Sequence, residues 1–315
     1  MTLLATTTSL REAYGLCLVE LGKRDPNMVV LEADLGKSTR SVLFQEAFPA
    51  RFFEMGIAEQ NMASTSAGLA LTGKTPFYST FAVFAVGRAY DQIRNSICIP
   101  GLKVRICGSS AGLSDFGDGK THQSVEDVAA MRVLPNMTVL VPADAIETAK
   151  MMAVMDTVPG PVYLRINRND LPLITPPGSP YRIGEITTVC SGQDAVVFAS
   201  GVMVSKAIEA AEMLAREGVD LKVLNVSTIK PLDRGAVIAH AKNMKGIVTA
   251  EEHSIIGGLG SAIAEALRME RHAPIEFVGI QDVFGISAKT YGELLDVYGL
   301  TTAAVVSAVR ATLSS

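Results

Sequence analysis

The chain of 315 residues contains no tryptophan, four histidines and four cysteines. The cysteines lie far apart without metal-ligand spacing, so we expect core residues in a reducing compartment: Cys17, Cys98, Cys107 and Cys190. The formal net charge is −4 and basic runs are missing, which excludes the electrostatic footprint of a nucleic-acid or anionic-membrane binder. Any anionic ligand must therefore be held by a few individually placed cations.

Long apolar runs and a secretory leader are also missing. The longest apolar stretches are broken by charge, Gly or Pro well short of the ~20 residues that span a bilayer. Residues 1–14 lack the basic region and the apolar block of a signal peptide, so we expect a cytoplasmic protein. Hydrophobic residues make up 48% of the chain and charged residues 19%, which excludes disorder and indicates a large core, a broad oligomer interface, or both.

The order of predicted elements is typical of an α/β protein with mostly parallel sheets. Residues 171–180 contain four prolines and a glycine, which marks a linker. We therefore expect two open α/β domains, one over residues 1–172 and a smaller one over 183–315, joined by a linker over 173–182. The main predicted helices cover residues 10–23, 58–72, 85–96, 145–155, 205–217, 233–242, 260–269 and 301–313, and the main predicted strands cover 28–31, 52–55, 103–107, 138–142, 162–166, 194–200, 221–226, 246–251 and 275–280.

One carboxylate stands out in the stretch Met55-Gly56-Ile57-Ala58-Glu59-Gln60-Asn61-Met62. Glu59 lies among small and apolar residues at the start of an uncharged run over residues 62–71. Burial raises the pKa of a carboxyl group, so such a group can stay protonated near neutral pH and donate a hydrogen bond. An acidic residue in a first helical turn is equally typical of a helix cap. This stretch alone favours neither interpretation.

Two loops are candidate ligand sites. The polar residues 32–38 follow a buried strand, and α/β sheets bind ligands at the ends of such strands. The stretch 108–123 contains four glycines and no periodicity, which is typical of a functional loop, and it includes His122. The aromatic residues between them, at 77, 78, 81 and 84, are more typical of core than of a ligand platform.

Three motifs in this order make the chain resemble a transketolase: Met-Gly-Ile-Ala-Glu-Gln-Asn, Ser79-Thr80-Phe81 and Asp118-Gly119-Lys120-Thr121-His122-Gln123. The resemblance covers essentially the whole chain, but only the carboxy-terminal half of a transketolase, which comprises the pyrimidine-binding and carboxy-terminal domains. It implies a thiamine-diphosphate-dependent enzyme that transfers a two-carbon ketol unit between sugar phosphates.

The diphosphate-binding half of a transketolase has no counterpart here, because the Gly-Asp-Gly run and downstream Asn that hold magnesium and diphosphate are missing. The resemblance thus implies a subunit of a split enzyme that is inactive alone. We expect a separate diphosphate-binding subunit, an α2β2 assembly, and thiamine diphosphate with Mg²⁺ between the two chains. The metal and diphosphate ligands are expected on the partner.

The resemblance implies cofactor contacts for Ile57, Glu59, Phe81 and Phe84. A transketolase glutamate at the position of Glu59 hydrogen-bonds the pyrimidine nitrogen and promotes the imino tautomer that deprotonates the thiazolium carbon. Phe81 and Phe84 match aromatics that stack on the pyrimidine ring. Gly87 stands where a third aromatic is usual, which predicts a more open pocket.

The resemblance also implies a substrate side of the site. Asp118 and His122 match residues that contact substrate hydroxyls, and His122 is a candidate proton carrier near neutral pH. Arg11, Ser38 and Arg168 match residues that grip the phosphate, for which an Arg fork offers two parallel charge-assisted bonds. A surface ion pair is the alternative for each Arg.

Three positions leave the identity of the substrate undecided. Arg165 is close enough to Arg168 to leave the alignment of the phosphate-binding Arg undecided. Gly108 stands where many transketolases have a phosphate-contacting histidine. Lys120 replaces a usual proline or small residue, where a cation either supplies the missing phosphate contact or faces water.

Other functions remain alternatives. A 1-deoxyxylulose-5-phosphate synthase fragment and a 2-oxo acid dehydrogenase β chain share the cofactor. The loop over residues 118–123, the hydroxyl-reading loop, favours transketolase over both, because contacts to hydroxyl groups suit sugars better than 2-oxo acids. A catalytically silent partner of a thiamine enzyme is disfavoured by Glu59, Phe81 and His122 occurring together. A nicotinamide enzyme is least supported, because residues 257–260 do not match G-x-G-x-x-G and the acidic residues at 251 and 252 would repel an anion.

The role assigned to Glu59 gives a first prediction. Glu59→Gln should still bind thiamine diphosphate but lose most of the deprotonation of the thiazolium carbon, because the amide cannot exchange a proton with the pyrimidine nitrogen. Exchange of that carbon-bound proton with solvent measures the effect. Near-normal activity of the variant would show that the role is wrong.

Overall fold

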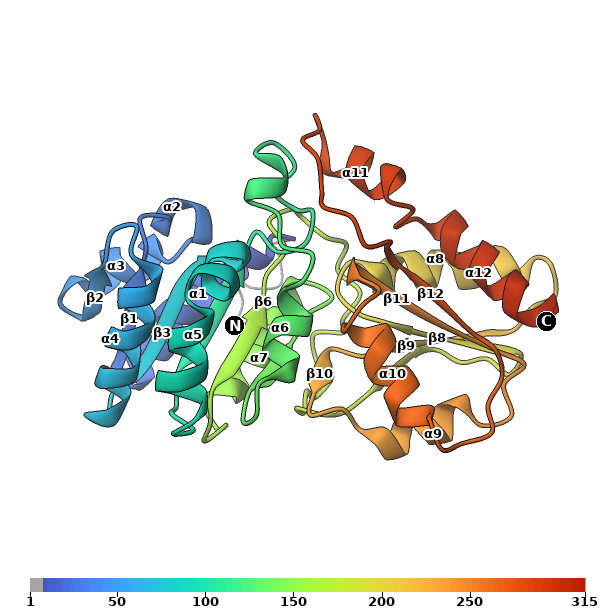
Figure 1. The fold of residues 1–315 in the computed structure, drawn as a ribbon, viewed down its shortest axis with the longest axis horizontal. Coiled ribbons are helices and arrows are strands. Elements are labelled where there is room, and N and C mark those ends of the chain that lie inside the picture. The colour runs from blue at the N-terminus through green and yellow to red at the C-terminus, as the bar shows by residue number, and fades with distance from the viewer. Residues whose placement is uncertain (1–7, 315) are drawn as a thin grey trace.

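The computed structural model describes residues 8–314 as two α/β halves that lie side by side (Figure 1). One sheet has seven strands in the order β10-β5-β6-β4-β3-β1-β2, and the other has five in the order β12-β11-β8-β9-β7. Among the strands formed by residues 8–314, the edge pairs β10–β5 and β7–β9 are antiparallel and the others are parallel. The predicted class of mostly parallel α/β sheets is confirmed. Residues 1–7, part of the amino terminus considered for a signal peptide, lie outside the described residues.

The first half alternates strands and helices from the amino terminus onward. Its strands are β1 (Met28–Glu32), β2 (Phe52–Glu54), β3 (Thr75–Phe81), β4 (Arg105–Ser109), β5 (Thr138–Leu140) and β6 (Val162–Arg165). Its α-helices are α1 (Leu10–Arg24), α2 (Gly36–Thr39), α3 (Val42–Ala47), α4 (Glu59–Leu71), α5 (Tyr90–Gln92), α6 (Asp127–Val133) and α7 (Ala145–Met155).

The central strands of this sheet are buried on both faces, and alternate residues enter two different cores. On β1, Met28 and Val30 pack with α1 and α7, whereas Val29 and Leu31 pack with α4 and α6. Neighbouring residues of a strand point to opposite faces of the sheet, which explains the division. A strand buried on both faces reads as a continuous apolar run, as this one does.

The second half repeats the arrangement around the smaller sheet. Its strands are β7 (Thr187–Cys190), β8 (Ala195–Ala199), β9 (Leu221–Asn225), β10 (Thr228–Lys230), β11 (Gly246–Ser254) and β12 (Ile275–Ile280). Its helices are α8 (Met203–Ala215), α9 (Arg234–Ala241), α10 (Leu259–Leu267), α11 (Tyr291–Val297) and α12 (Thr302–Ser314). Although β10 follows β9 directly, it pairs with β5 and so extends the sheet of the first half.

Two regions differ from the sequence-based expectation. The predicted helix over 85–96 is present only as the short α5 between π-helical turns at Phe84–Arg88 and Ile93–Cys98. Gly87, which has the lowest helix propensity of any residue but proline, lies in the first of these turns. The short elements β7, β10 and α11 had no prediction, because three to seven residues are too few to show a period.

The stretch Tyr291–Ser314 is apolar and long enough to cross a membrane by length and composition alone. In the fold it is divided into α11 and α12. Leu294, Val305 and Val309 from these helices are fully buried in the core. Packing inside the protein therefore accounts for these three side chains, while about a third of the apolar window as a whole is buried.

A buried ion pair joins β6 to α6. Arg165 donates from Nε to Oδ2 of Asp127 at 2.8 Å and from Nη2 to Oδ1 at 3.1 Å. The Tyr163 hydroxyl donates to the same carboxylate at 2.7 Å. The Asp127 side chain is fully buried and that of Arg165 is 6% exposed, so neither charge is solvated by water.

Removing one partner of this pair should destabilise the fold strongly. We expect Asp127→Ala to lower the free energy of unfolding by roughly 3–5 kcal/mol, because the Arg165 charge stays buried without its main partner. Asp296→Ala, at an exposed position of α11, is the matched control and should change it by less than about 0.5 kcal/mol. Denaturant titration measures both, and equal effects would contradict the prediction.

Candidate functional site

The predicted site residues follow the carboxyl ends of the parallel strands. Ser38 comes after β1, Glu59 after β2 and Arg168 after β6, while Phe81 ends β3 and the loop over 110–123 follows β4. Parallel neighbours end at the same edge of a sheet, where α/β proteins bind ligands. Topology therefore gathers groups that are more than a hundred positions apart in the sequence.

Arg11 joins this edge from the start of α1. The segment before α1 lies beside the chain that leaves β6, since Ser9 bridges Asp170 and the Leu171 amide donates to the Thr8 carbonyl. Arg11 then donates from Nη1 to the Ser38 carbonyl oxygen at 2.8 Å.

Electrostatics show that Arg11 and Arg168 are neighbours. Burial lowers the pKa of the Arg11 guanidinium, and the charges of Arg168 and Arg40 lower it further. The buried Nε of Arg11 has no hydrogen-bond partner within residues 8–314. A half-buried guanidinium with a free donor beside a second cation is suited to an anionic ligand.

Arg168 lies between this cation and the aromatic residues. Its Nη1 is 2.6 Å from Oδ2 of Asp115, and its guanidinium carbon is 5.8 Å from the centroid of the Phe81 ring. Arg165 instead points into the core, where Asp127 neutralises it. Of the two arginines that the sequence left open, Arg168 is the one that lies in the cluster.

Three rings form the adjoining wall. Phe81 and Phe84 are nearly parallel, with an interplanar angle of 11° and centroids 6.1 Å apart. His122 meets both rings edge-on, with its centroid 5.4 Å from that of Phe84. Thr121 Oγ1 lies 2.9 Å from His122 Nδ1 and orients the imidazole. This wall combines two phenyl rings with one imidazole, and Phe81 is the buried member, 3% exposed.

Glu59 is the first residue of α4 and is 3% exposed. Among the described residues no side chain caps this helix, and the residue at the cap position is Ala58. The Tyr78 hydroxyl donates to the Glu59 carbonyl oxygen at 3.5 Å, which ties the start of α4 to β3. Ile57, two residues earlier, is 77% exposed. A buried carboxylate and an exposed apolar side chain are therefore two residues apart at the start of α4.

The remaining predicted positions are either at the surface or buried in the core. Asp118 and Lys120 are exposed on the loop after β4. A side chain at Gly87 would enter open space, whereas a Cβ at Gly108 would lie 2.3 Å from the Tyr163 hydroxyl. Gly108 therefore faces Tyr163 in the core, and the absence of a side chain there is a packing requirement.

The sequence placed two carboxylates in the candidate loops but assigned no role to either. Asp115 holds Arg168, and its only signal was its place in the glycine-rich loop. Glu32 ends β1 and accepts hydrogen bonds from Thr39 Oγ1 at 2.8 Å and Ser41 Oγ at 2.5 Å. It thereby anchors the turn that carries Ser38. Burial raises the pKa of Glu32 to about 7, and the two hydroxyl donors limit the rise.

The amides of the glycine-rich turn before α10 are already bonded to a side chain of this chain. Glu251 accepts from the amides of Leu259 at 2.7 Å and Gly260 at 2.8 Å, so its carboxylate caps the helix where a phosphate would bind. Within residues 8–314 there is no group of three or more His, Cys, Asp or Glu that could hold a metal ion.

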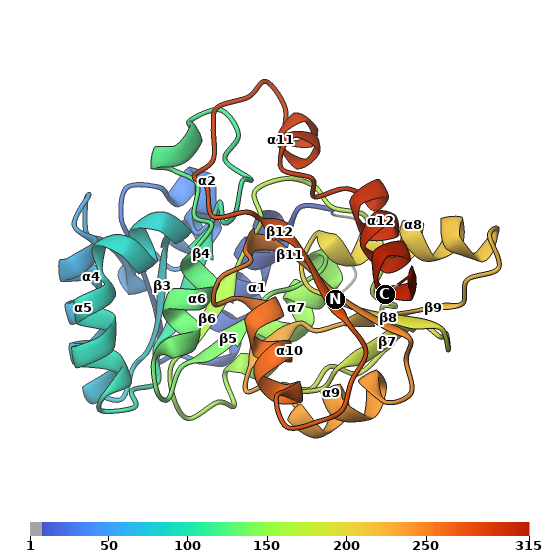
Figure 2. The same cartoon turned by 45° about the vertical axis from the view of Figure 1, so that its right-hand side comes forward.

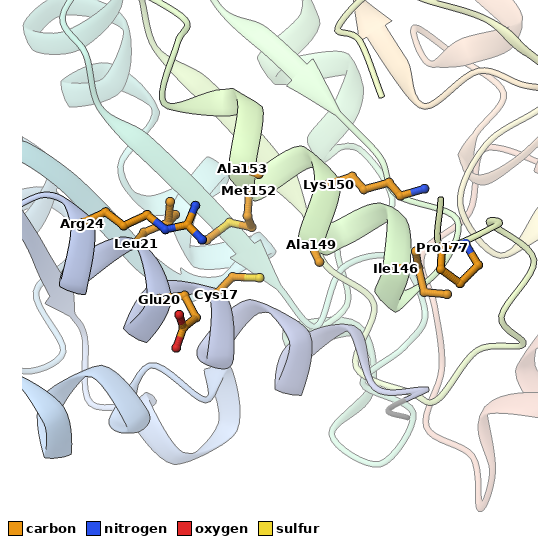
Figure 3. Close-up of a pocket in the computed structure, with 10 residues that line it drawn as sticks. All are labelled: Cys17, Glu20, Leu21, Arg24, Ile146, Ala149, Lys150, Met152, Ala153 and Pro177. Carbon is orange, nitrogen blue, oxygen red and sulfur yellow. The ribbon is translucent and has the colours of Figure 1, made fainter. Parts of the chain in front are cut away.

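A separate cavity of about 200 Å³ lies between α1 and α7 (Figure 3). Its described lining includes none of the predicted site residues and is mostly apolar: Cys17, Glu20, Leu21, Arg24, Ile146, Ala149, Lys150, Met152, Ala153 and Pro177.

Comparison with known families agrees with this architecture. Residues 6–173 match the model of the transketolase pyrimidine-binding domain, and residues 184–305 match that of the transketolase C-terminal domain. The chain belongs to the transketolase family. The predicted resemblance is thus confirmed at the level of family and of these two domains.

Relatives extend over nearly the same length. A protein named as a transketolase C-terminal section in Methanocaldococcus jannaschii is 42% identical, over 92% of each chain. The 6-deoxy-6-sulfo-D-fructose transketolase subunit SqwH of Clostridium sp. is 38% identical over 96% of this chain and 93% of its own. A solved structure described as a split gene transketolase, inactive beta4 tetramer, is 49% identical, with a TM-score of 0.90 over 97% of this chain and 98% of its own.

The raised pKa of Glu32 predicts that the stability of this transketolase-family chain depends on pH. Its pKa of about 7 in the folded protein lies above the ordinary 4.5, so the folded state holds this proton more tightly than the unfolded state. Stability should therefore fall as pH rises from about 4.5 to 7, by on the order of 3 kcal/mol from this group.

Glu32→Gln should remove that part of the pH dependence, which denaturant titration at pH 5 and pH 8 measures. Glu46→Gln, an exposed position on α3, should leave it in place. The same pH dependence in wild type and Glu32→Gln would contradict the assignment.

Proposed function

We propose that this chain is one subunit of a split, thiamine-diphosphate-dependent transketolase that transfers a two-carbon ketol unit between sugar phosphates. The observation that carries the proposal is the gathering of Glu59, the Phe81 and Phe84 rings, His122 and the two arginines at one edge of one sheet. Each group has a separate task in such a transfer. The family membership supports the assignment.

The residues present fit the pyrimidine end of thiamine diphosphate. Glu59 offers a buried carboxyl group, Phe81 and Phe84 offer parallel faces for a flat ring, and Ile57 offers an exposed apolar side chain for the same ligand. When bound, the cofactor supplies the thiazolium carbon that takes up and passes on the two-carbon unit. Glu59 would hold the pyrimidine nitrogen through its carboxyl group and would exchange a proton with it.

The other end of the site fits a polyhydroxylated anion. Arg11 and Arg168 hold its charged group with Ser38 beside them, and His122 and Asp118 contact its hydroxyls. His122 also moves a proton to or from the reacting oxygen. Lys120 adds an exposed cation at the mouth of the site.

The charged group of the sugar need not be a phosphate. Two guanidinium groups bind any tetrahedral oxyanion, and one close relative is named for a 6-deoxy-6-sulfo-D-fructose substrate. A sulfonated ketose is therefore the second candidate donor. The same arginines serve in either case, so only a substrate comparison separates the two.

We propose that activity requires a second chain. The two matched domains include none for the cofactor's diphosphate, and a related solved structure is described as an inactive beta4 tetramer of a split gene transketolase. The partner supplies the diphosphate and Mg²⁺ ligands, in a cytoplasmic α2β2 assembly. Without it this chain associates with copies of itself and is inactive.

Reconstitution tests the proposal. The chain is mixed with the diphosphate-binding subunit from the same organism, thiamine diphosphate and Mg²⁺, and two-carbon transfer to ribose 5-phosphate is measured. Xylulose 5-phosphate and 6-deoxy-6-sulfofructose are compared as donors. We expect transfer by the mixture from at least one donor and none by either chain alone. Turnover by this chain alone, or no transfer from either donor, would contradict the proposal.

A further inference from the structure

One carboxylate of the second half reaches into the site of the first. Glu252 of β11 accepts a hydrogen bond from the Leu113 amide to Oε1 at 2.8 Å and from Asn167 Nδ2 to Oε2 at 3.1 Å. The side chain is 3% exposed. A Cβ at Gly112 would lie 2.5 Å from this carboxylate, so the backbone of the loop packs directly on it.

Both hydrogen-bond donors belong to segments that carry site residues. Leu113 stands at the start of the loop that bears Asp115, Asp118 and His122, and the ends of this loop are joined by paired amides of Gly112 and Ser124. Asn167 directly precedes Arg168. One carboxylate therefore links the hydroxyl-reading loop to the strand end that carries the anion-binding arginine.

The segment before α11, in the second half, also forms hydrogen bonds with this loop. The Ala288 amide donates to the Phe116 carbonyl at 2.8 Å, and Gln123 Nε2 donates to the Ile286 carbonyl at 3.0 Å. The segment before α11 lies against the loop in both views (Figures 1 and 2). The second half contributes backbone groups to these two contacts, whereas Glu252 contributes a side chain that bonds both the loop and Asn167. Arg168 and Asn169 also bond the loop directly, through Asp115 and the Ser114 carbonyl.

We propose that Glu252 is a positioning residue of the transfer reaction, which sets the loop with His122 at the correct distance from Arg168. The proposal rests on the function proposed above. Glu252 touches neither substrate nor cofactor and acts through Leu113 and Asn167. A shift of about 1 Å in such a supporting contact is enough to impair a site whose groups must converge on one ligand.

The groups around Glu252 make its hold on the loop depend on pH. Arg165 of β6 approaches Oε2 at 4.0 Å and is itself paired with Asp127 of α6, while the Tyr291 phenol of α11 faces the carboxylate. Burial raises the pKa of Glu252 to about 7, although Arg165 and the hydrogen-bond donors lower it. The ionised carboxylate accepts hydrogen bonds from both Leu113 and Asn167. In the protonated form one oxygen carries an O–H group, which is itself a donor and therefore a poorer partner for a donor. The loop is therefore held more firmly above pH 7.

The neighbouring Glu251 is a matched control. It lies on the same strand, is equally buried, and bonds two backbone amides, but those amides belong to α10 and not to the site. Replacement of either acid therefore removes a buried carboxylate and two hydrogen bonds. Only replacement of Glu252 should disturb the loop.

Amide hydrogen exchange of the chain without its partner tests the positioning directly. In Glu252→Ala, we expect exchange across residues 111–124 to be about 10-fold faster than in wild type, as expected for the loss of a buried hydrogen bond. Glu251→Ala should accelerate exchange in α10 and leave residues 111–124 unchanged. Unchanged exchange across 111–124 in Glu252→Ala would overturn the proposal, and this result does not depend on any turnover.

Kinetics of the reconstituted complex give the second readout. Glu252→Ala should raise the KM of the phosphorylated acceptor about 10-fold, because Arg168 and the loop no longer converge. Glu251→Ala should lower Tm without changing this KM. Equal KM changes in both variants would mean that Glu252 is only structural. If the wild-type complex shows no transfer, the proposed function fails, while the exchange measurement still decides the role of Glu252.

Glu252→Gln covers the case in which the alanine variant does not fold. The amide keeps one accepting oxygen and cannot ionise. After correction for the intrinsic exchange rate, protection of residues 111–124 should rise between pH 6 and pH 8 in wild type and stay constant in Glu252→Gln. The same pH dependence in both proteins would overturn the proposal.

Discussion

The buried ion pair between Arg165 and Asp127 is the interaction on which the rest of this structure depends. A charge removed from water is tolerated only when it is paired and hydrogen-bonded. Asp127 of α6 lies 2.8 Å away, and the Glu252 carbonyl of β11 accepts from Arg165 Nη2 at 2.9 Å. Satisfying this one charge fixes β6 against α6 and the second half of the chain against the first.

The site uses a second arginine, three residues later, in the opposite way. Arg168 pairs with the carboxylate of Asp115 and lies against Phe81 and near Arg11, whose guanidinium also feels the charges of Asp115 and Asp170. Arg165 is neutralised inside the core, whereas Arg168 is only partly buried at the sheet edge, where we propose that it binds the ligand. The second half contributes to this edge indirectly, through the contacts that hold the loop after β4.

Much of the fold was predictable because its elements are long and regular. The helix predicted over 145–155 and the strand predicted over 275–280 match α7 and β12 residue for residue, since both show uninterrupted apolar periodicity. The helix over 85–96 was the main failure, because local turn geometry around Gly87 depends on packing and not on the apolar pattern. The motifs predicted most of the residues that meet at this edge, but the only signal of Asp115 was its place in the glycine-rich loop, and Glu252 had no signal that pointed to the site.

The sequence by itself determined the α/β class, the family resemblance and the residue types able to do the chemistry, because periodicity and short motifs are local properties. Only the tertiary structure decided which of Arg165 and Arg168 lies at the site and why position 108 holds glycine. It also decided that Glu59 is buried at the start of α4 without a capping bond within the described residues. Those answers depend on contacts between residues far apart in the chain. Burial and pairing of charge are set by such contacts, and no single stretch of sequence contains them.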